Sequence, residues 1–406
     1  MKVGIEKLRL YAGWFCTDAV ELAKARGKDE AYVIDEVMVG FRAVIPPYED
    51  AVTLAVNAAK DLLTPEDRQK IDLLIVATES GVDFGKPIST WVHRFCDLPA
   101  NCRNFEVKHA CYGGTAAFKQ ALLWVAAMGP SRKALVISTD LTRPHPAGGY
   151  DFIGGGCSVA MLVSTEPEIV ETDPCEAGYW TNEISDTFRP TAREEIGDNQ
   201  ASLYSYLDGL DGAYEHFEKV TQGRLDPTSF KKYIYHAPFP GMTFQAHRSL
   251  MGQLGIVDKH AVEADFDQRV LDGLGFAKRI GTAYGASNFV SLLGLLHSGR
   301  DLHAGDTISM FAYGSGCQAE FYCSRIGATA VSRVQSMQID RYLDSRLVLP
   351  LDEFESNEEF RSRLTDCPNY EPRRGDDRQA YSRFYEGKGL LVLKRVSDFR
   401  REYQWS

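Results

Sequence analysis

The sequence predicts an α/β protein whose 406 residues form two similar halves, 1–173 and 174–406. Three observations carry this prediction. The chain is longer than one hydrophobic core usually supports. Its first half combines short, continuous apolar runs with a buried helix, which is typical of strands covered on both faces. The second half repeats that order of elements.

The first half contains four strand candidates and one helix candidate. Residues 71–78 (IDLLIVAT) are apolar almost throughout, as expected of a strand buried on both faces. A second strand is expected at 104–109, followed by a glycine turn and a buried helix at 116–127. Two further strands are expected at 133–138 and 157–163. These elements make up the predicted core of the first half.

The second half presents the same kinds of element. A short strand is expected at 233–236, a helix at 288–296, and two closing strands at 306–312 and 317–323. Two local correspondences support duplication: Gly114-Thr-Ala-Ala-Phe118 resembles Gly285-Ala-Ser-Asn-Phe289, and Gly155-Gly-Cys157 resembles Ser315-Gly-Cys317. Chance similarity between glycine turns is the alternative explanation of these matches.

Two segments lie outside this repeat. Residues 174–224 are polar, charged and aromatic, and favour a helical insertion over the mouth of an active site. Four aromatic side chains in this segment are expected to need burial: Tyr204, Tyr206, Tyr214 and Phe217. The tail from residue 350 onward is charged but ends in the apolar run 389–394. We expect that run to add an edge strand or a hairpin to the second half.

Charge and composition exclude several functional classes. A net charge of −11 is unsuited to nucleic acid and gives no general attraction to an anionic membrane. The nine scattered cysteines form no C-x-x-C pair, as is typical of reduced thiols, and no signal peptide or membrane-spanning run is present. We therefore expect a soluble, cytoplasmic protein. No His, Cys or Asp cluster has zinc-ligand spacing, so no metal site is predicted.

Cys111 is the first candidate for chemistry. It lies where a strand ends and a buried helix begins, so the free N–H groups and the positive dipole of the helix N-terminus are expected to face its sulfur. Such a setting lowers a thiol pKa and populates the nucleophilic thiolate. Gly113 and Gly114 allow the backbone to approach an acyl group and form an oxyanion hole. A buried structural cysteine is the alternative, and this residue alone does not exclude it.

His236 and Glu79 are the other two candidates. His236 follows a short strand and precedes a proline-rich turn, and Glu79 ends the apolar strand at 71–78. Each has an ordinary structural explanation by itself. Together with Cys111 they all end predicted central strands, where ligand sites gather in α/β proteins. The set suits thioester chemistry, because a cysteine carries the acyl group, a histidine orients, and a carboxylate moves a proton.

At these residues the sequence resembles the hydroxymethylglutaryl-CoA synthases over nearly the whole chain. The matching motifs are Thr78-Glu79-Ser80, Ala110-Cys111-Tyr112-Gly113-Gly114-Thr115-Ala116, His236-Ala237-Pro238 and Tyr313-Gly314-Ser315-Gly316. The sequence is more similar to the branch that works in polyketide assembly, the hydroxymethylglutaryl-ACP synthases of β-branching cassettes. The stretches 78–86, 236–242, 246–248 and 399–405 indicate that branch.

The resemblance implies the five-layered αβαβα thiolase fold with two pseudo-repeated halves and a homodimer. It implies that Cys111 is the acyl-thioester nucleophile, Glu79 the general acid/base, and His236 the residue that orients the acceptor. No bound cofactor is implied; the phosphopantetheine of an acyl carrier protein, or CoA, carries the substrate. The implied partners are the donor and acceptor carrier proteins of a polyketide synthase.

The implied reaction is an acyl transfer followed by an aldol-type condensation. Acetyl passes from a donor carrier protein to Cys111, and Glu79 then deprotonates the acetyl methyl carbon. The enolate attacks the β-ketone of a polyketide on an acceptor carrier protein, and hydrolysis frees Cys111. The product carries a carboxymethyl branch and a tertiary alcohol, which partner enzymes are expected to dehydrate and decarboxylate.

Four further residues are expected to bind the substrate: Thr282, Tyr112, Gly314 and Ser315. Thr282 departs from the family, which usually has Asn after the glycine that opens the second-half helix. A threonine hydroxyl can donate one hydrogen bond, but with a shorter reach than an amide. Ala312 likewise replaces a Ser that is common in the family. The acceptor step is therefore the part of the implied reaction that these departures affect.

Three alternatives stay open. A mevalonate-pathway hydroxymethylglutaryl-CoA synthase would use two CoA thioesters and would need basic residues at its pocket mouth. A non-catalytic carrier-binding protein would keep the fold without turnover, and Thr282 in place of Asn is the feature that supports it. A decarboxylating ketosynthase is less consistent with the sequence, because such enzymes use a Cys–His–Asn set.

Overall fold

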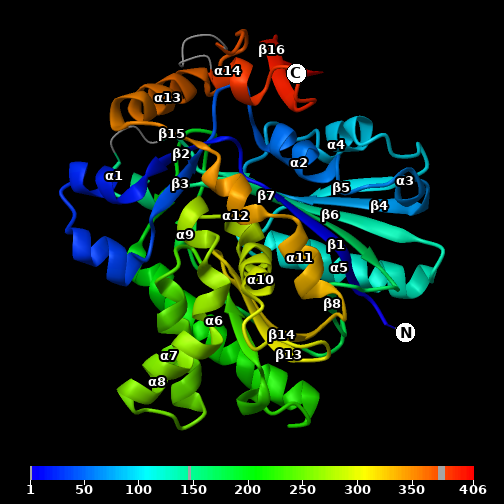
Figure 1. The fold of residues 1–406 in the computed structure, drawn as a ribbon, viewed down its shortest axis with the longest axis vertical. Helices are drawn as coiled ribbons and strands as arrows, with labels where there is room; N and C mark the ends of the chain where they lie inside the picture. Colours follow the sequence, from blue (N-terminus) through cyan, green and yellow to red (C-terminus); the bar gives the residue numbers. More distant parts are fainter. Residues whose placement is uncertain (1, 145–147, 374–379) are drawn as a thin grey trace.

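The computed structural model describes residues 2–144, 148–373 and 380–406, and a mixed sheet of ten strands runs through it (Figure 1). The strand order is β12-β13-β14-β8-β1-β7-β6-β4-β5, with β9 paired along part of β14. The pairs β4–β5, β4–β6 and β12–β13 are parallel, and the other pairs are antiparallel. The strands are β1 (Gly4–Tyr11), β4 (Ile71–Ala77), β5 (Arg103–Val107), β6 (Lys133–Leu141), β7 (Gly156–Ser164), β8 (Val170–Glu171), β9 (Ala177–Thr181), β12 (Lys232–Tyr235), β13 (Thr307–Gly314) and β14 (Gln318–Ile326).

Helices cover both outer faces of this sheet, and two of them lie between the two halves of the sheet (Figure 1). They are α1 (Ala19–Ala25), α2 (Ala51–Ala59), α3 (Pro65–Lys70), α4 (Ser89–Phe95), α5 (Gly113–Met128), α6 (Asn199–Thr221), α7 (Met242–Gln253), α8 (Lys259–Arg269), α9 (Ala277–Ile280), α10 (Ser287–Ser298), α11 (Ala330–Ser336), α12 (Ile339–Asp344), α13 (Leu351–Leu364) and α14 (Ala380–Phe384). A small sheet pairs β2 (Phe15–Asp18) with β3 (Phe41–Val44) and β15 (Leu347–Val348).

The alternation of side chains along each strand explains the layers. In β4, Ile75 faces the central core whereas Val76 faces the outer core under α2. In β13, Met310 faces the central core whereas Phe311 faces a third core formed with α6 and α7. Strands that are apolar on both faces therefore separate three cores. The five-layered αβαβα order and the two similar halves expected from the sequence are confirmed.

The two central helices, α5 and α10, pack against each other between the two halves of the sheet. The rings of Phe118 in α5 and Phe289 in α10 meet edge to face, with their centroids 5.8 Å apart. Both phenylalanines belong to the two similar motifs found in the sequence. The strands and helices expected at 71–163 and 233–323 are present, with ends shifted by a few residues.

The halves meet where glycine backbones touch. A methyl group on Gly114 would lie 2.1 Å from the carbonyl oxygen of Gly285, and one on Gly155 would lie 2.4 Å from that of Ile280. Neither position has room for a side chain, because Cβ atoms do not approach oxygen so closely. The backbone N–H of Thr282 donates to Ile153 O at 2.9 Å and joins the halves directly. Close backbone contact thus brings the strand ends of both halves together.

The segment 174–224 is only partly the expected helical insertion. Helix α6 is present, but β9 joins the main sheet and a small hairpin follows, formed by β10 (Thr187–Phe188) and β11 (Ile196–Gly197). The expected burial of Tyr204 is wrong, since its side chain is 57% exposed, whereas the other three aromatic residues of that set are buried. On a helix, neighbouring positions face different directions, so Tyr206 enters the core and Tyr204 does not.

The C-terminal tail forms the expected hairpin but at a different place. Strands β16 (Leu391–Ser397) and β17 (Arg400–Trp405) pair with each other and lie against the first half, not the second. Leu391 exchanges hydrogen bonds with the Asn57 side chain in α2, and Leu393 N–H donates to Tyr48 O. Leu391 and Val392 thereby complete the outer core of the first half. In the described part of the chain, no helix is long and apolar enough to cross a membrane.

We predict that Gly155→Ala destabilises the protein by about 1–3 kcal/mol, because its methyl group overlaps the Ile280 carbonyl. Urea unfolding followed by circular dichroism measures the change in midpoint. Gly252→Ala is the matched control, since Gly252 lies within α7 with open space around it. That variant should be as stable as the parent or slightly more so. Equal loss in both variants would contradict the tight contact.

Candidate active site

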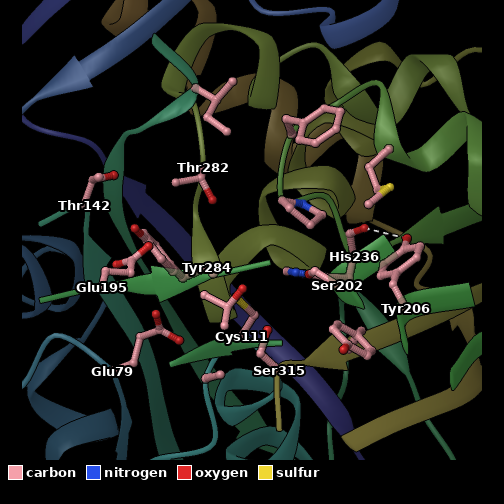
Figure 2. A pocket seen from close by; sticks show the side chains of 18 of the residues that line it. Glu79, Cys111, Thr142, Glu195, Ser202, Tyr206, His236, Thr282, Tyr284 and Ser315 are labelled. Atoms are coloured by element: carbon pink, nitrogen blue, oxygen red, sulfur yellow. Dashed lines mark hydrogen bonds between the residues drawn. The ribbon is translucent and has the colours of Figure 1, made fainter. Parts of the chain in front are cut away.

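A cavity of about 2280 Å³ opens between the two halves (Figure 2). Its walls include Glu79 and Cys111 from the first half and His236, Thr282 and Ser315 from the second. Pockets for small molecules usually measure about 300–1,000 Å³, so this space suits a long or bulky substrate. Helix α6 contributes Ser202, Leu203 and Tyr206 to the lining. The three candidates for chemistry therefore share one cavity.

Cys111 lies between strand β5 and the first residue of α5, as the sequence predicted. Ala110 before it has a φ of 41°, an uncommon backbone conformation that turns the chain from strand to helix. Burial raises the pKa of the Cys111 thiol well above its ordinary value, and Glu79 and Asp140 raise it further, whereas Arg189 lowers it. The expectation that the helix N-terminus would populate the thiolate is therefore wrong. The resting group is a neutral thiol.

Glu79 follows β4 and faces the cavity near Cys111 (Figure 2). Its backbone N–H donates to the carboxylate of Asp140 at 2.9 Å, and Arg189 forms an ion pair with its side chain at 3.2 Å. Burial raises the pKa of Glu79, with Asp140 and Glu195 adding to the effect and Arg189 opposing it. A carboxyl group with a raised pKa can both accept and return a proton near neutral pH.

Asp140 is a buried carboxylate that organises the end of β4. It accepts hydrogen bonds from Thr78 Oγ1 at 3.0 Å and Ser80 Oγ at 2.8 Å, as well as from Glu79 N–H. Burial raises the pKa of Asp140, while these hydrogen bonds lower it. The network fixes the backbone at Glu79 and so fixes where its side chain starts.

His236 ends β12 and faces the cavity from the other half. Its Nδ1 is 2.5 Å from the hydroxyl oxygen of Ser287, and its carbonyl accepts a hydrogen bond from Tyr206 at 2.8 Å (Figure 2). Burial lowers the pKa of His236 to about 3, so the imidazole is neutral. With Nδ1 bonded to Ser287, Nε2 is the ring nitrogen left to meet a ligand. A neutral imidazole in this position is suited to orient a carbonyl group.

The four expected substrate-binding residues divide into two pairs. Thr282 and Ser315 line the cavity, and Figure 2 shows Ser315 beside Cys111 and Thr282 farther along the wall, beyond Tyr284. Tyr112 and Gly314 are absent from the lining within the described chain. The Tyr112 hydroxyl donates to buried Glu320 at 2.7 Å, which directs its side chain away from the cavity. The absence of a side chain at Gly314 has a structural explanation, because a methyl group there would lie 2.5 Å from Tyr112 N.

Several residues that shape the site were missed in the sequence. Asp140 had a usable signal, because it follows the apolar run 133–138 as Glu79 follows 71–78. No sequence signal marked three other residues that shape the site, Arg189, Glu195 and Tyr284. Their positions depend on how the hairpin and the glycine turn fold over the cavity. Within residues 2–144, 148–373 and 380–406, no group of three His, Cys, Asp or Glu side chains is arranged to hold a metal ion.

Comparisons with known proteins agree on one family. The N-terminal model of hydroxymethylglutaryl-coenzyme A synthase matches residues 1–168, and the C-terminal model matches residues 256–406. The chain is 36% identical to the polyketide biosynthesis 3-hydroxy-3-methylglutaryl-ACP synthase of Bacillus subtilis (strain 168), covering 100% of this chain and 99% of that protein. It is 30% identical to the hydroxymethylglutaryl-CoA synthase of Enterococcus faecalis, covering 88% of this chain and 91% of that one.

Solved structures give the same result. The hydroxymethylglutaryl synthase of the curacin biosynthetic pathway superimposes with a TM-score of 0.93 at 37% identity, with 100% of both chains covered. That enzyme in complex with its holo donor-ACP matches with the same TM-score at 36% identity and equal coverage. The thiolase-like fold is therefore confirmed.

We predict that Glu79→Gln makes Cys111 react faster with iodoacetamide at a given pH above neutrality. Removing a negative charge lowers the pKa of the Cys111 thiol and increases its thiolate fraction. Peptide mass spectrometry follows the reaction, with exposed Cys175 as an internal reference. Glu106→Gln, the same charge change elsewhere in the cavity wall, is the control. An unchanged rate in Glu79→Gln, or full reaction of wild-type Cys111 at acidic pH, would contradict the raised pKa of the thiol and the part of Glu79 in raising it.

Proposed function

We propose that this chain, which belongs to the hydroxymethylglutaryl-CoA synthase family, adds an acetyl-derived carbanion to the β-ketone of a polyketide on an acyl carrier protein. One observation carries the proposal: a single large cavity joins Cys111 and Glu79 of one half to His236 of the other. The choice of a carrier protein over CoA is supported by the greater identity to a hydroxymethylglutaryl-ACP synthase, 36% against 30%.

Acylation of Cys111 is the first step. The thiol sulfur attacks the carbonyl carbon of the donor's acetyl thioester, and the C–S bond to the phosphopantetheine thiol breaks. The proton from Cys111 passes to that departing thiolate. Because burial keeps Cys111 neutral in the resting state, the thiol loses its proton only as the new bond forms. No bound cofactor takes part in this step, since the phosphopantetheine arm arrives with the donor.

Glu79 moves the proton that creates the nucleophile for carbon–carbon bond formation. Its carboxylate takes a proton from the acetyl methyl carbon on Cys111, and the resulting enolate attacks the β-carbonyl carbon of the acceptor. The protonated carboxyl group then returns the proton to the new alkoxide, which becomes the tertiary alcohol. A raised pKa suits both halves of this task, because the conjugate acid is stable enough to persist between them.

His236 orients the acceptor ketone. Ala237 N–H and Nδ1 of His236 both contact the Ser287 hydroxyl, so an O–H donated to Nδ1 leaves the proton on Nε2. The Nε2–H group then donates to the ketone oxygen, where negative charge develops. Thr282 stands at the cavity wall as a second, shorter donor. Water finally cleaves the Cys111 thioester, which leaves a free carboxylate on the branch and restores the thiol.

We also propose that the enzyme is a homodimer. Strand β5 ends the main sheet with one edge unpaired in the described chain, and a second copy of this protein would extend the sheet there as a homodimer. A monomeric mass in solution would contradict that arrangement.

All nine cysteines are free thiols, and a nucleophilic Cys111 needs a reducing compartment, so we place the enzyme in the cytoplasm beside its polyketide synthase.

We predict that acetyl-ACP acetylates Cys111 faster than acetyl-CoA does when both are offered at equal concentration. Intact-protein mass spectrometry with isotopically distinct acetyl groups reports which donor supplied the label. Cys111→Ser checks that the label resides on the thiol. Faster labelling from CoA would instead support a mevalonate-pathway synthase, and no labelling from either donor would support a carrier-binding protein without turnover.

A second prediction separates the steps. Glu79→Gln should still form acetyl-enzyme but lose condensation by about 10²–10⁴-fold, because only the second step needs the carboxylate. His236→Ala should acylate normally and lose activity toward the acceptor, whereas His260→Ala, whose side chain is 90% exposed, should behave as wild type. Mass analysis of the enzyme and of the acceptor carrier measures both steps. Equal loss of acylation and condensation in Glu79→Gln would mean that its role is misassigned.

A further inference from the structure

We propose that Arg189 and Glu195 form a positioning pair that orients the Glu79 carboxylate and sets its charge state. This inference rests on the proposed role of Glu79 as the acid/base. Both residues come from the segment between β9 and α6, outside the strands that carry the three candidate catalytic residues.

The hairpin register explains why these two residues meet. Strands β10 and β11 pair Thr187 with Gly197 and Phe188 with Ile196, so the next pair along the same register is Arg189 with Glu195. The Arg189 Nε donates to Glu195 Oε2 at 2.7 Å, and Nη2 lies 2.7 Å from the same oxygen. These two contacts with Glu195 fix the orientation of the Arg189 guanidinium relative to the hairpin. Figure 2 shows the Glu195 end of this pair beside Glu79 and Tyr284.

Arg189 then holds Glu79 at two points. Its Nη2 lies 3.2 Å from Glu79 Oε1, and its Nη1 donates to the Glu79 backbone carbonyl at 3.2 Å. The guanidinium also lies over the Tyr284 ring, 5.0 Å from its centroid, and the Arg189 side chain is only 10% exposed. A planar, buried guanidinium that is bonded at its edge to two glutamates and lies over a tyrosine ring has little freedom to rotate. Its contacts with both the side chain and the backbone of Glu79 therefore restrict where the carboxylate can lie.

Arg189 and Glu195 shift the pKa of Glu79 in opposite directions. Other charged or titratable groups also face Glu79, and they belong to several elements: Asp140 in β6, Arg143 after it, Cys111 before α5, and Tyr284. Arg189 lowers the pKa of Glu79 and Glu195 raises it. A residue that merely stabilised the hairpin would not produce effects of opposite sign when each partner is neutralised.

The test measures single-turnover condensation of preformed acetyl-enzyme against pH. Condensation rises with pH as Glu79 loses its proton. Arg189→Gln should move that rise to higher pH by about 1–3 units, because an opposite charge within reach is lost. Glu195→Gln should move it to lower pH, because a like charge is lost. Arg189→Lys should restore part of the wild-type profile, since it keeps the charge without the planar fork.

Arg193→Gln is the matched control. Arg193 belongs to the same segment and also pairs with a carboxylate, Asp366, but its side chain is 51% exposed. Its profile should coincide with that of wild type, and thermal melts confirm folding of each variant. Shifts in the same direction for Arg189→Gln and Glu195→Gln, or no shift in either, would overturn the inference. Acylation and condensation by the wild type are scored separately, so failure of the proposed function is distinguishable from failure of this pair.

Discussion

Backbone-to-backbone contact between the two halves is the constraint on which the site depends. Gly114 and Gly285 touch without room for a Cβ atom, and Gly155 touches the turn that carries Thr282. These contacts bring the end of β5, with Cys111, to within reach of the cavity wall that β12 supplies with His236. A side chain at any of these glycines would separate the halves. The nucleophile and the acceptor-orienting residue would then no longer share one cavity.

Several carboxyl groups lie buried near Cys111, and the guanidinium of Arg189 offsets part of their negative charge. Glu79, Asp140 and Glu195 all lie close enough to Cys111 that each of these carboxylates raises the pKa of the thiol. Arg189 offsets part of this charge and spans two of the three carboxylates. Burial, and after it these carboxylates, raises the pKa of Cys111 and explains why it rests as a neutral thiol although it precedes a helix. It also leaves Glu79 able to exchange a proton near neutral pH.

Much of the fold was predictable because its central strands are apolar on both faces. The runs at 71–78 and 133–138 could be recognised without knowing their neighbours, since helices cover the sheet on each side. Strand β9 could not, because it lies at the edge of the sheet and exposes Tyr179 and Trp180. The tail was expected on the wrong half, since its apolar run specifies burial but not which core it completes.

The site was predictable to the extent that its residues end central strands. Cys111, Glu79 and His236 share that position and do share the cavity, although their chemical roles are proposals. Tyr112 adjoins Cys111 in sequence, but the start of a helix turns its side chain toward Glu320. Arg189 and Glu195 depend on the register of a two-residue ladder, which no local pattern specifies.

Carbon–carbon bond formation is tested most directly by following the mass of the acceptor over time. Acetyl-enzyme, freed of donor, is mixed with a β-ketoacyl carrier protein, and the mass of the acceptor is followed over a single turnover. We expect the acceptor to gain the elements of one acetic acid, the acetyl group of the enzyme plus the hydroxyl of one water, while the remaining hydrogen restores the Cys111 thiol. An acetyl-enzyme that persists or hydrolyses while the acceptor keeps its mass would contradict this expectation.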